Sequence, residues 1–327
     1  MHLGKVWILA EQRDGVPAAV VFELATAARG FGNVVEAVTW GRGSLEAAPA
    51  LAQFGCTKIY DVGDIGTSLP GPKVAAAIAT MVGGDQRPDA IYIGATYDGR
   101  DIAGRLSARL DLPVLTNIVG LEVADDTLIT QHAIFGGSQL LRARFSGAGP
   151  GIFVIRSKSF PAEPMATDGE ATNPEIVAVG VPETGASDAA RIVARHEEER
   201  TGPKLDEAAV VVSGGRGLGS PDNYALVAEL AQLLHGAPGA SRAIVDAGWV
   251  PYALQVGQTG KTVKPTVYIA CGISGATQHM VGMKSARNII AINKDREAPI
   301  FSIADLGVVG DVTKVIPKLI EEIKARR

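Results

Sequence analysis

Residues 266–279 read TVYIACGISGATQH, and the fold of the last third of the chain follows from this stretch. Residues 267–270 are β-branched, aromatic or small apolar side chains, which predict a short buried strand. Gly272 ends the strand, Ser274 is a preferred helix N-cap, and Gly275 would let a ligand approach the backbone closely. A strand, a turn of small residues and a helix start predict an anion site, because the first amide groups of a helix lack partners.

Two further polar loops are expected beside this turn. Residues 256–261 read VGQTGK, and residues 288–292 predict another buried strand that ends in the polar residues 293–295. Loops that follow parallel strands meet at one edge of the sheet, where ligands bind in open α/β folds. These segments therefore predict one ligand site at the carboxyl edge of a C-terminal sheet.

Earlier in the chain, short apolar runs alternate with segments of helical periodicity, which predicts a parallel sheet with helices on both faces. The strands are expected at residues 6–10, 34–39, 58–61 and 90–93, and the helices at residues 18–29, 45–54, 74–81 and 100–110. Residues 120–155 show short alternating strands, which we interpret as a hairpin addition. Residues 157–182 are expected to form a surface loop, and residues 190–196 fit either a helix or a strand.

A charged segment broken by glycine and proline, residues 197–205, is the best candidate for a linker. A chain of 327 residues is long enough for about two domains. After the linker, strands are expected at residues 208–212, 243–245, 267–270, 288–292 and 301–303, with one helix capped by Asp222 and another that begins at Asp311 and is kinked or restarted at Pro317. The predicted fold class is α/β, with two doubly wound domains of mainly parallel sheets at residues 1–196 and 206–327.

Composition and charge argue against several function classes. The formal net charge is −4 and no basic block is interleaved with aromatic residues, so a nucleic-acid partner is not expected. No apolar run approaches the roughly 20 residues of a membrane helix, so membrane insertion is not expected. The first residues resemble neither a signal peptide nor a transit peptide, so we expect a cytoplasmic protein if the source is bacterial. Cys56 and Cys271 are expected to be free thiols, and the histidines have no metal-ligand spacing.

Residues 214–219, GGRGLG, follow a predicted strand but do not match a nicotinamide site. That fingerprint would need G-x-G-x-x-G and an acid about 20 residues further on, where position 234 is Leu. Arg216 between the glycines favours a phosphate or adenosine contact, with an ordinary turn as the alternative. No Ser-His-Asp order, close Cys-His pair or paired carboxylate stands out, so neither a catalytic residue nor a metal ligand is expected.

Four blocks of the C-terminal third resemble a known family. They are VGQTGK at 256–261, YIACGISGATQH at 268–279, AINKDREAPIF at 291–301 and GDVTKVIP at 310–317. They are similar to the FAD-binding signature of the electron transfer flavoprotein alpha subunit, and blocks that agree in order and spacing are far more specific than a lone glycine motif. Residues 92–103, YIGATYDGRDIA, resemble the first domain of the same family. The chain departs from the family pattern at Thr116-Asn117, where a small residue and an aspartate would be expected.

The resemblance implies an electron carrier instead of a substrate-converting enzyme. It implies one FAD per chain in the C-terminal domain, and contact of the N-terminal domain with a beta subunit that holds AMP or a second FAD. Electrons would come from acyl-CoA or other flavin dehydrogenases and pass to a quinone reductase, with the linker letting the FAD domain swivel between partners. Two alternatives stay open: an NAD(P)-dependent two-domain dehydrogenase, and a non-redox adenine-nucleotide binder.

The resemblance also assigns roles to residues at the expected site. Arg242 lies against the isoalloxazine ring, His279 donates to the flavin C2 carbonyl oxygen, and Thr259 faces N5. A cation and a donor there favour the reduced, anionic ring, and a protonated imidazole would do so more strongly. Asn293 and Asp311, with the backbone of Val312, contact the adenosine half. Each of the side chains named here also has an ordinary interpretation as a surface, packed, turn or cap residue. The residues expected to bind FAD are Arg216, Ser241, Arg242, Val256, Gly257, Gln258, Thr259, Ser274, Gly275, Ala276, Thr277, Gln278, His279, Asn293, Asp311 and Val312.

Overall fold

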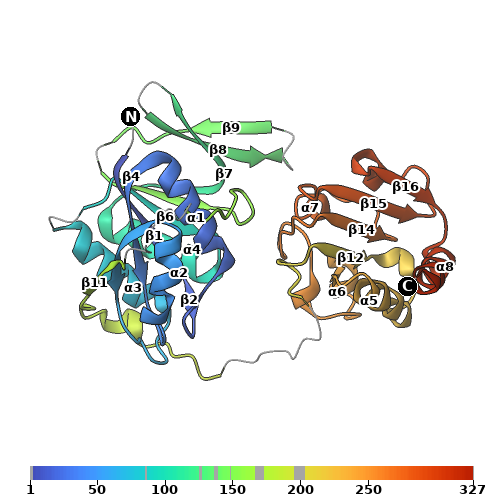
Figure 1. Cartoon of the computed structure of the whole chain (residues 1–327), viewed down its shortest axis with the longest axis horizontal. Helices are drawn as coiled ribbons and strands as arrows, with labels where there is room; N and C mark the ends of the chain where they lie inside the picture. The colour runs from blue at the N-terminus through green and yellow to red at the C-terminus, as the bar shows by residue number, and fades with distance from the viewer. Residues whose placement is uncertain are drawn as a thin grey trace. The chain divides into compact units, whose positions relative to one another are not determined.

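The structure, a computed structural model, describes residues 3–84, 87–124, 127–135, 139–147, 149–165, 173–194 and 203–326. The chain divides into two compact units, Met1–His196 and Glu197–Arg327, each with its own sheet (Figure 1). Residues 197–202 of the expected linker lie outside the described residues, so the linker stays a prediction.

The first unit is built on a nine-stranded sheet in the order β11-β5-β4-β1-β6-β10-β7-β8-β9. Its strands are parallel except for the pairs β7–β8 and β8–β9, which are antiparallel. The strands are β1 (Leu3–Ala10), β4 (Gly32–Thr39), β5 (Cys56–Asp61), β6 (Ala90–Gly94), β7 (Val114–Ala124), β8 (Thr127–Ile134), β9 (Gln139–Ala143), β10 (Gly151–Ile155) and β11 (Glu175–Ala178), with a small separate hairpin of β2 (Gln12–Arg13) and β3 (Val16–Pro17).

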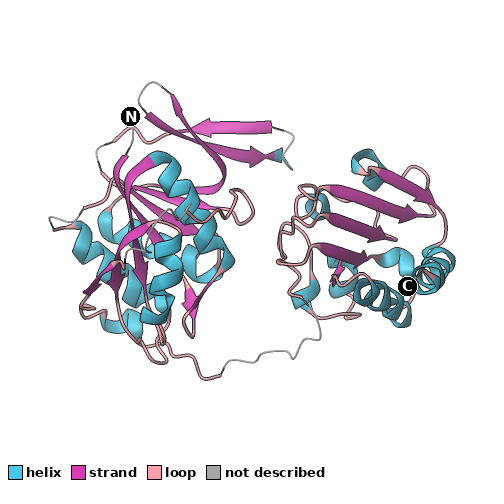
Figure 2. Ribbon diagram, in the orientation of Figure 1, coloured by secondary structure: helices cyan, strands magenta, loops and turns pink. Residues whose placement is uncertain are grey.

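Helices cover both faces of this sheet (Figure 2). One apolar core joins the sheet to α1 (Ala19–Phe31) and to α2 (Ala48–Gln53), which follows the 3₁₀ turn η1 (Leu45–Ala47). A second core joins the other face to α3 (Pro70–Val82) and α4 (Tyr97–Leu110). The doubly wound prediction is confirmed, because an alternating strand and helix pattern can bury both faces of a parallel sheet only in this way.

Two strands of this unit differ from the prediction. β10 is not part of a hairpin: it lies parallel between β6 and β7, and all five of its residues are buried. A continuous apolar run is the usual sequence of such a doubly covered strand. β11 was missed inside the expected loop at 157–182, and it extends the sheet by pairing with β5, where Lys58 Nζ lies 3.0 Å from Glu175 Oε2. Residues 190–194 form neither helix nor strand, apart from an isolated bridge between Arg191 and Ser68.

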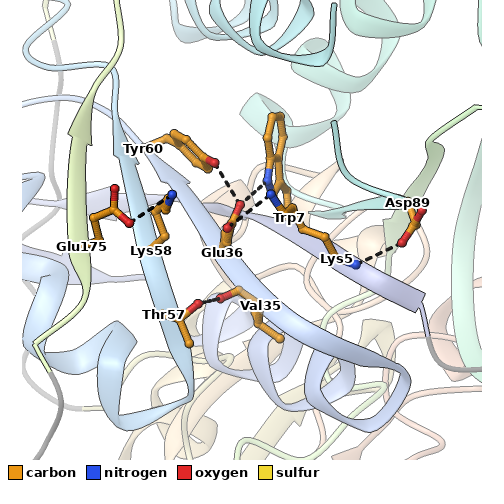
Figure 3. Close-up of polar contacts among 9 residues, drawn as sticks. All are labelled: Lys5, Trp7, Val35, Glu36, Thr57, Lys58, Tyr60, Asp89 and Glu175. Atoms are coloured by element: carbon orange, nitrogen blue, oxygen red, sulfur yellow. Dashed lines mark hydrogen bonds and ion pairs between the residues drawn. The ribbon is translucent and has the colours of Figure 1, made fainter. Parts of the chain in front are cut away.

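A buried carboxylate fixes the register of the first three parallel strands (Figure 3). Glu36 on β4 is only 4% exposed. Its Oε2 accepts hydrogen bonds from Trp7 Nε1 on β1 at 2.8 Å and from Tyr60 Oη on β5 at 3.0 Å, and its Oε1 lies 3.5 Å from Lys5 Nζ. A buried charge is costly unless it is paired and hydrogen-bonded, so these partners hold the three strands in one alignment.

The second unit has a five-stranded, fully parallel sheet in the order β13-β12-β14-β15-β16. Its strands are β12 (Val210–Gly214), β13 (Ala237–Ala240), β14 (Val267–Cys271), β15 (Asn288–Asn293) and β16 (Leu306–Val309). Its helices are α5 (Tyr224–Leu233), α6 (Arg242–Val245), α7 (Thr277–Met280) and α8 (Val312–Ala325), with 3₁₀ turns η4 (Arg216–Leu218), η5 (Pro221–Asn223), η6 (Tyr252–Leu254) and η7 (Pro299–Ile303). Helices α5 and α8 bury one face of this sheet.

Two predicted strands of the second unit are wrong. Residues 243–245 belong to α6, and the second strand is β13 just before them. The sequence of β13, APGA, has little strand propensity, but Gly239 is needed there because a Cβ would lie 2.3 Å from Ser213 Oγ. Residues 301–303 belong to η7, and the last strand is β16.

Of the three predicted helix N-caps, Asp222, Ser274 and Asp311, only Asp311 is confirmed. The Asp311 side chain accepts a hydrogen bond from Thr313 N at 3.0 Å and caps α8, as expected, and α8 continues through Pro317 without restarting. Asp222 is not a cap, since it lies inside η5 and Asn223 occupies the N-cap position of α5. Ser274 is not a cap either, because α7 begins three residues later at Thr277.

Candidate functional site

The strand order of the second unit places a switch point between β12 and β14. From β12 the chain moves to one side, to β13, and then crosses back to β14, β15 and β16 on the other side. Gly214 at the end of β12 is level with Ala240 and Cys271, and Cys271 is level with Ile292, so four strands end together. Ligands of doubly wound folds bind at this edge, beyond the carboxyl ends of the strands.

The glycine-rich loop after β12 crosses the turn after β14 backbone to backbone. Gly215 N donates to Cys271 O and Gly217 N donates to Gly272 O, both at 2.9 Å. A Cβ on Gly217 would lie 2.7 Å from the Cα of Gly272, and Gly272 itself has a φ of +63°. These glycines are therefore required by the packing of the two loops, and the turn they form leaves Arg216 exposed at the switch point.

The VGQTGK loop folds against α7, so two separately predicted segments form one wall of the site. Gln258 N donates to Gln278 O at 2.7 Å, and Val256 N donates to Ala240 O at 2.9 Å. A Cβ on Gly282, just after α7, would lie 2.4 Å from Gly257 N, so this contact is also tight. The structure thus brings residues 256–259 next to residues 277–279.

Thr259 is held in its turn by two residues that the sequence analysis missed. Gln255 Nε2 donates to Thr259 Oγ1 at 3.0 Å, and Tyr252 Oη donates to the Thr259 carbonyl. Gln255 is only 2% exposed, whereas Thr259 is on the surface. The sequence does hold one signal for this contact: the polar residue Gln255 stands directly before the glycine-rich loop at 256–261.

His279 on α7 is the buried polar centre of the site, only 6% exposed. Its Nε2 lies 2.9 Å from Tyr268 Oη on β14, and its Nδ1 is buried without a hydrogen-bond partner among the described residues. Burial lowers the pKa of His279 to about 4, against a smaller opposite effect of the Val256 backbone. The ring is therefore neutral near pH 7, so the stronger effect that a protonated imidazole would have is not available here.

Ser241 and Arg242 lie where β13 ends and α6 begins. Ser241 is 8% exposed, and its backbone N donates to Gly214 O at 2.9 Å, which ties this corner to the end of β12. Arg242 is exposed, and its Nε donates to Asp246 Oδ2 at 3.0 Å. This bond uses one donor of the guanidinium, so its two terminal amino groups keep their donors for a ligand.

The three residues assigned to the adenosine half lie at the ends of β15 and β16. Asn293 Nδ2 donates to Ile273 O at 2.9 Å and its Oδ1 accepts from Asp295 N at 3.0 Å, so its side chain holds two loops. The hydrogen bonds from Thr313 to Asp311 are the main cause that lowers the pKa of this carboxyl. Both residues thus have structural roles, Val312 is buried, and contact with an adenosine stays a prediction.

The turn that carries Ser274, Gly275 and Ala276 is packed against η7. Ile300 N donates to Ser274 O at 3.0 Å. Gly275 has a φ of +88°, and a Cβ there would lie 2.3 Å from Ile300 N. The protein itself therefore requires Gly275, and Ser274 and Ala276 face outward on the surface of the turn.

Comparison with known proteins covers both units. A family model described as "Electron transfer flavoprotein domain" matches residues 6–184, and one described as "Electron transfer flavoprotein FAD-binding domain" matches residues 204–284. "Electron transfer flavoprotein subunit alpha" of Syntrophomonas wolfei is 41% identical over 322 residues, covering 97% of this chain and 98% of the relative. The protein of the same name from Mycobacterium tuberculosis (strain H37Rv) is 43% identical over 332 residues, covering 99% and 100%.

The chain belongs to the electron transfer flavoprotein alpha-subunit family. The resemblance found in the sequence is thereby confirmed, and with it an electron carrier that binds a flavin. The residues present fit such a ligand. Nδ1 of His279 is buried with no hydrogen-bond partner among the described residues, and Arg216 and Arg242 expose cations suited to an anionic dinucleotide.

The described residues carry neither a metal cluster nor a membrane-spanning helix. No group of three or more His, Cys, Asp or Glu side chains there could hold a metal ion. Cys56 and Cys271 are free and buried, as expected. None of the described helices combines the length and the apolar character needed to cross a membrane.

Proposed function

We propose that this electron transfer flavoprotein alpha subunit binds one FAD at the carboxyl edge of its C-terminal sheet and serves as a redox carrier. The observation that carries this proposal is the position of His279. It presents a buried nitrogen with no hydrogen-bond partner among the described residues, inside the segment that matches the FAD-binding domain of the family. Buried polar atoms are nearly always hydrogen-bonded, so an unpaired one at a ligand edge marks a binding contact.

The bound flavin supplies the redox chemistry, and the chain's own residues set how favourable its reduction is. Arg242 keeps its charge at every relevant pH and stabilises negative charge that develops on the ring. His279 contributes as a neutral donor, since burial keeps its pKa low. Thr259 offers a hydroxyl that can donate or accept, and Gln255 fixes its position by donating to Oγ1 at 3.0 Å.

The first unit is proposed to bind a beta subunit, which would hold AMP or a second FAD. An antiparallel arm, formed by β7, β8 and β9, ends the sheet with the edge strand β9. Figure 1 shows this arm projecting beyond the helices of the unit. Leu140 and Leu141 on β9 are 62% and 50% exposed, and Phe135 at the end of β8 is 75% exposed. An unpaired strand edge with exposed apolar side chains is typical of a surface that another chain covers.

The proposed donors are acyl-CoA or other flavin dehydrogenases, and the proposed acceptor is a quinone reductase, in a bacterial cytoplasm. In this role the chain itself transforms no substrate. The arrangement of the site supports a carrier role, because it combines hydrogen-bond donors with fixed cations suited to an anionic dinucleotide.

Purification of the chain together with a co-expressed beta subunit, followed by cofactor extraction, tests the proposal. We expect a yellow complex that yields FAD, and a loss of FAD when both Arg242→Ala and His279→Ala are introduced. A colourless complex that reduces NAD(P)⁺ with a substrate would support the dehydrogenase alternative. A colourless complex that binds AMP but no FAD would support an adenine-nucleotide binder.

A further inference from the structure

Tyr268 is the hydrogen-bond partner of the His279 ring. It lies on β14 with its ring wholly buried, and its hydroxyl is 2.9 Å from Nε2 of His279. Burial raises the pKa of Tyr268, and the neighbouring Ser213 hydroxyl opposes this only in part. The phenol therefore keeps its proton at physiological pH, and that proton needs an acceptor in the interior.

The two neutral tautomers of His279 leave different numbers of buried groups unsatisfied. If the proton is on Nδ1, the Tyr268 hydroxyl donates to Nε2, and only the Nδ1–H group lacks a partner in the described structure. If the proton is on Nε2, that group donates to the phenol oxygen, and both the phenol proton and Nδ1 are left without partners. The Ser213 hydroxyl lies near the phenol, but its Oγ has no hydrogen-bond partner among the described residues and so does not accept the phenol proton.

We infer that Tyr268 is a positioning residue for His279: its hydroxyl donates to Nε2 and thereby holds the proton of the neutral ring on Nδ1, where it is available to the bound flavin. Which ring nitrogen carries the proton is set by the hydrogen bond that the other nitrogen makes. A carbonyl oxygen of the flavin can only accept, so the Nδ1–H tautomer is the one that binds it. This inference rests on the proposed FAD site.

Nitrogen-15 NMR on the full chain with labelled histidine, before FAD is added, tests the tautomer directly. The signal of His279 is identified by its disappearance in His279→Gln. We expect the wild-type signal to show a proton on Nδ1, and we expect Tyr268→Phe to move it towards a mixture of tautomers. Tyr224→Phe is the matched control, because it removes a partly buried hydroxyl of the same unit that donates to Gly239 O at 3.0 Å instead of to His279.

The midpoint potential of the flavin in the complex gives a second readout that a purely structural role would not move. A hydrogen bond of ordinary strength predicts that Tyr268→Phe lowers the ratio of reduced to oxidised flavin at a fixed potential by about two- to tenfold. In a His279→Gln background the same substitution should change nothing, because Tyr268 acts through His279. An equal shift in both backgrounds would overturn the inference.

The outcomes separate this inference from the proposed function. A wild-type proton on Nε2 overturns the inference even if Tyr268→Phe does not fold, since that measurement needs no variant of Tyr268. Failure of the wild-type complex to bind FAD overturns the proposed function, while the Nδ1–H signal would still establish how Tyr268 orients His279. A bound flavin with an unchanged tautomer and potential in Tyr268→Phe would leave the function standing and remove Tyr268 from it.

Discussion

Among single residues, Arg242 has a charge that an adjacent carboxylate partly balances. Its Nε donates to Oδ2 of Asp246, the residue that follows α6, at 3.0 Å, and the two side chains are 66% and 59% exposed. An exposed pair of this kind contributes little to folding stability. Its electrostatic effect on a ligand at the end of β13 is a separate matter, because the guanidinium attracts negative charge there and the carboxylate repels it.

We therefore expect opposite effects from substitutions of the two partners. Arg242→Gln should lower the two-electron midpoint potential of the flavin by about 30–60 mV, the equivalent of one hydrogen bond to a charged group. Asp246→Asn should raise it by a smaller amount, and Arg242→Lys should retain most of the wild-type value. Spectroelectrochemical titration of the complex at constant ionic strength measures all three. A potential that is the same in Arg242→Gln and the wild type would remove this residue from the flavin environment.

Glu11 gives the first unit a stability that depends on pH. Its Oε1 accepts a hydrogen bond from Thr96 Oγ1 at 2.5 Å, and Thr96 in turn caps α4 by accepting from Gly99 N at 2.9 Å. Burial is the largest cause that raises the pKa of Glu11 to about 7, with a further rise from the charge of Asp98. The folded state therefore binds a proton at this site between pH 4.5 and 7 that the unfolded state has already released.

The sign of the pH effect follows from this difference. A raised carboxyl pKa stabilises the fold fully below the unfolded value and loses that contribution as pH rises through the folded value. From pH 5 to pH 8.5, we expect wild type to lose about 1–3 kcal/mol of unfolding free energy relative to Glu11→Gln. Denaturant titration in a Trp249→Phe background, followed by Trp7 and Trp40 fluorescence, reports on the first unit alone. The exposed acid Glu46, changed to Gln, is the control, and an identical pH profile for Glu11→Gln and wild type would contradict the expectation.

At the scale of elements, the crossing of the loops after β12 and β14 holds the site together. Gly217→Ala would place a Cβ 2.7 Å from the Cα of Gly272, which has no side chain to move aside. We expect it to destabilise the second unit by about 1–3 kcal/mol, the usual range for overpacking, and to weaken FAD binding. Arg216→Ala in the same turn removes an exposed side chain, so it should weaken FAD binding while leaving stability nearly unchanged. Thermal unfolding of the chain without FAD, together with FAD titration, measures both effects, and a Gly217→Ala chain as stable as wild type would be contrary to this account.

The elements that could be predicted from sequence are those whose local pattern and tertiary place agree. β14 and β15 are apolar runs buried on both faces, and the cap at Asp311 is a short-range bond, so each was found within a residue or two. β13 could not be found, because its APGA sequence is stabilised by neighbours that are distant in the chain. Because β13 was missed, Ser241 and Arg242 were expected just before a strand, whereas the structure places them at the start of helix α6.

The site was predictable as a set of loops but not as a set of contacts. Strand-end glycines and a family resemblance located residues 256–259 and 274–279. The partner of His279 is Tyr268, which lies in an apolar strand where an aromatic residue is ordinary core. Only the distance between its hydroxyl and Nε2 identifies it as a partner of His279. The neutral state of His279 follows from the burial of its ring, which a short sequence motif does not reveal.

At the scale of the whole molecule, the two units are separately compact, and each has its own apolar core. The first unit has the exposed arm of β7, β8 and β9, and the second has the candidate FAD site. A carrier must bring one flavin close to a donor and later to an acceptor, and segments between domains are where such reorientation takes place. The proposed linker, residues 197–205, is therefore the part of the sequence on which exchange should depend.

We expect a stiffened linker to slow electron exchange while leaving FAD bound. Replacing residues 197–202 with a proline-rich segment of equal length would favour an extended, semi-rigid conformation. The reduced flavin should then pass electrons to its acceptor more slowly by a factor of ten or so, if reorientation limits the exchange. The control is a Gly-Ser segment of equal length, which is a flexible chain and should behave as wild type. Stopped-flow reduction and reoxidation of the complex measure the rates, and FAD content and midpoint potential must stay the same in all three proteins. Equal rates in the stiff and flexible proteins would show that electron exchange does not need the second unit to turn.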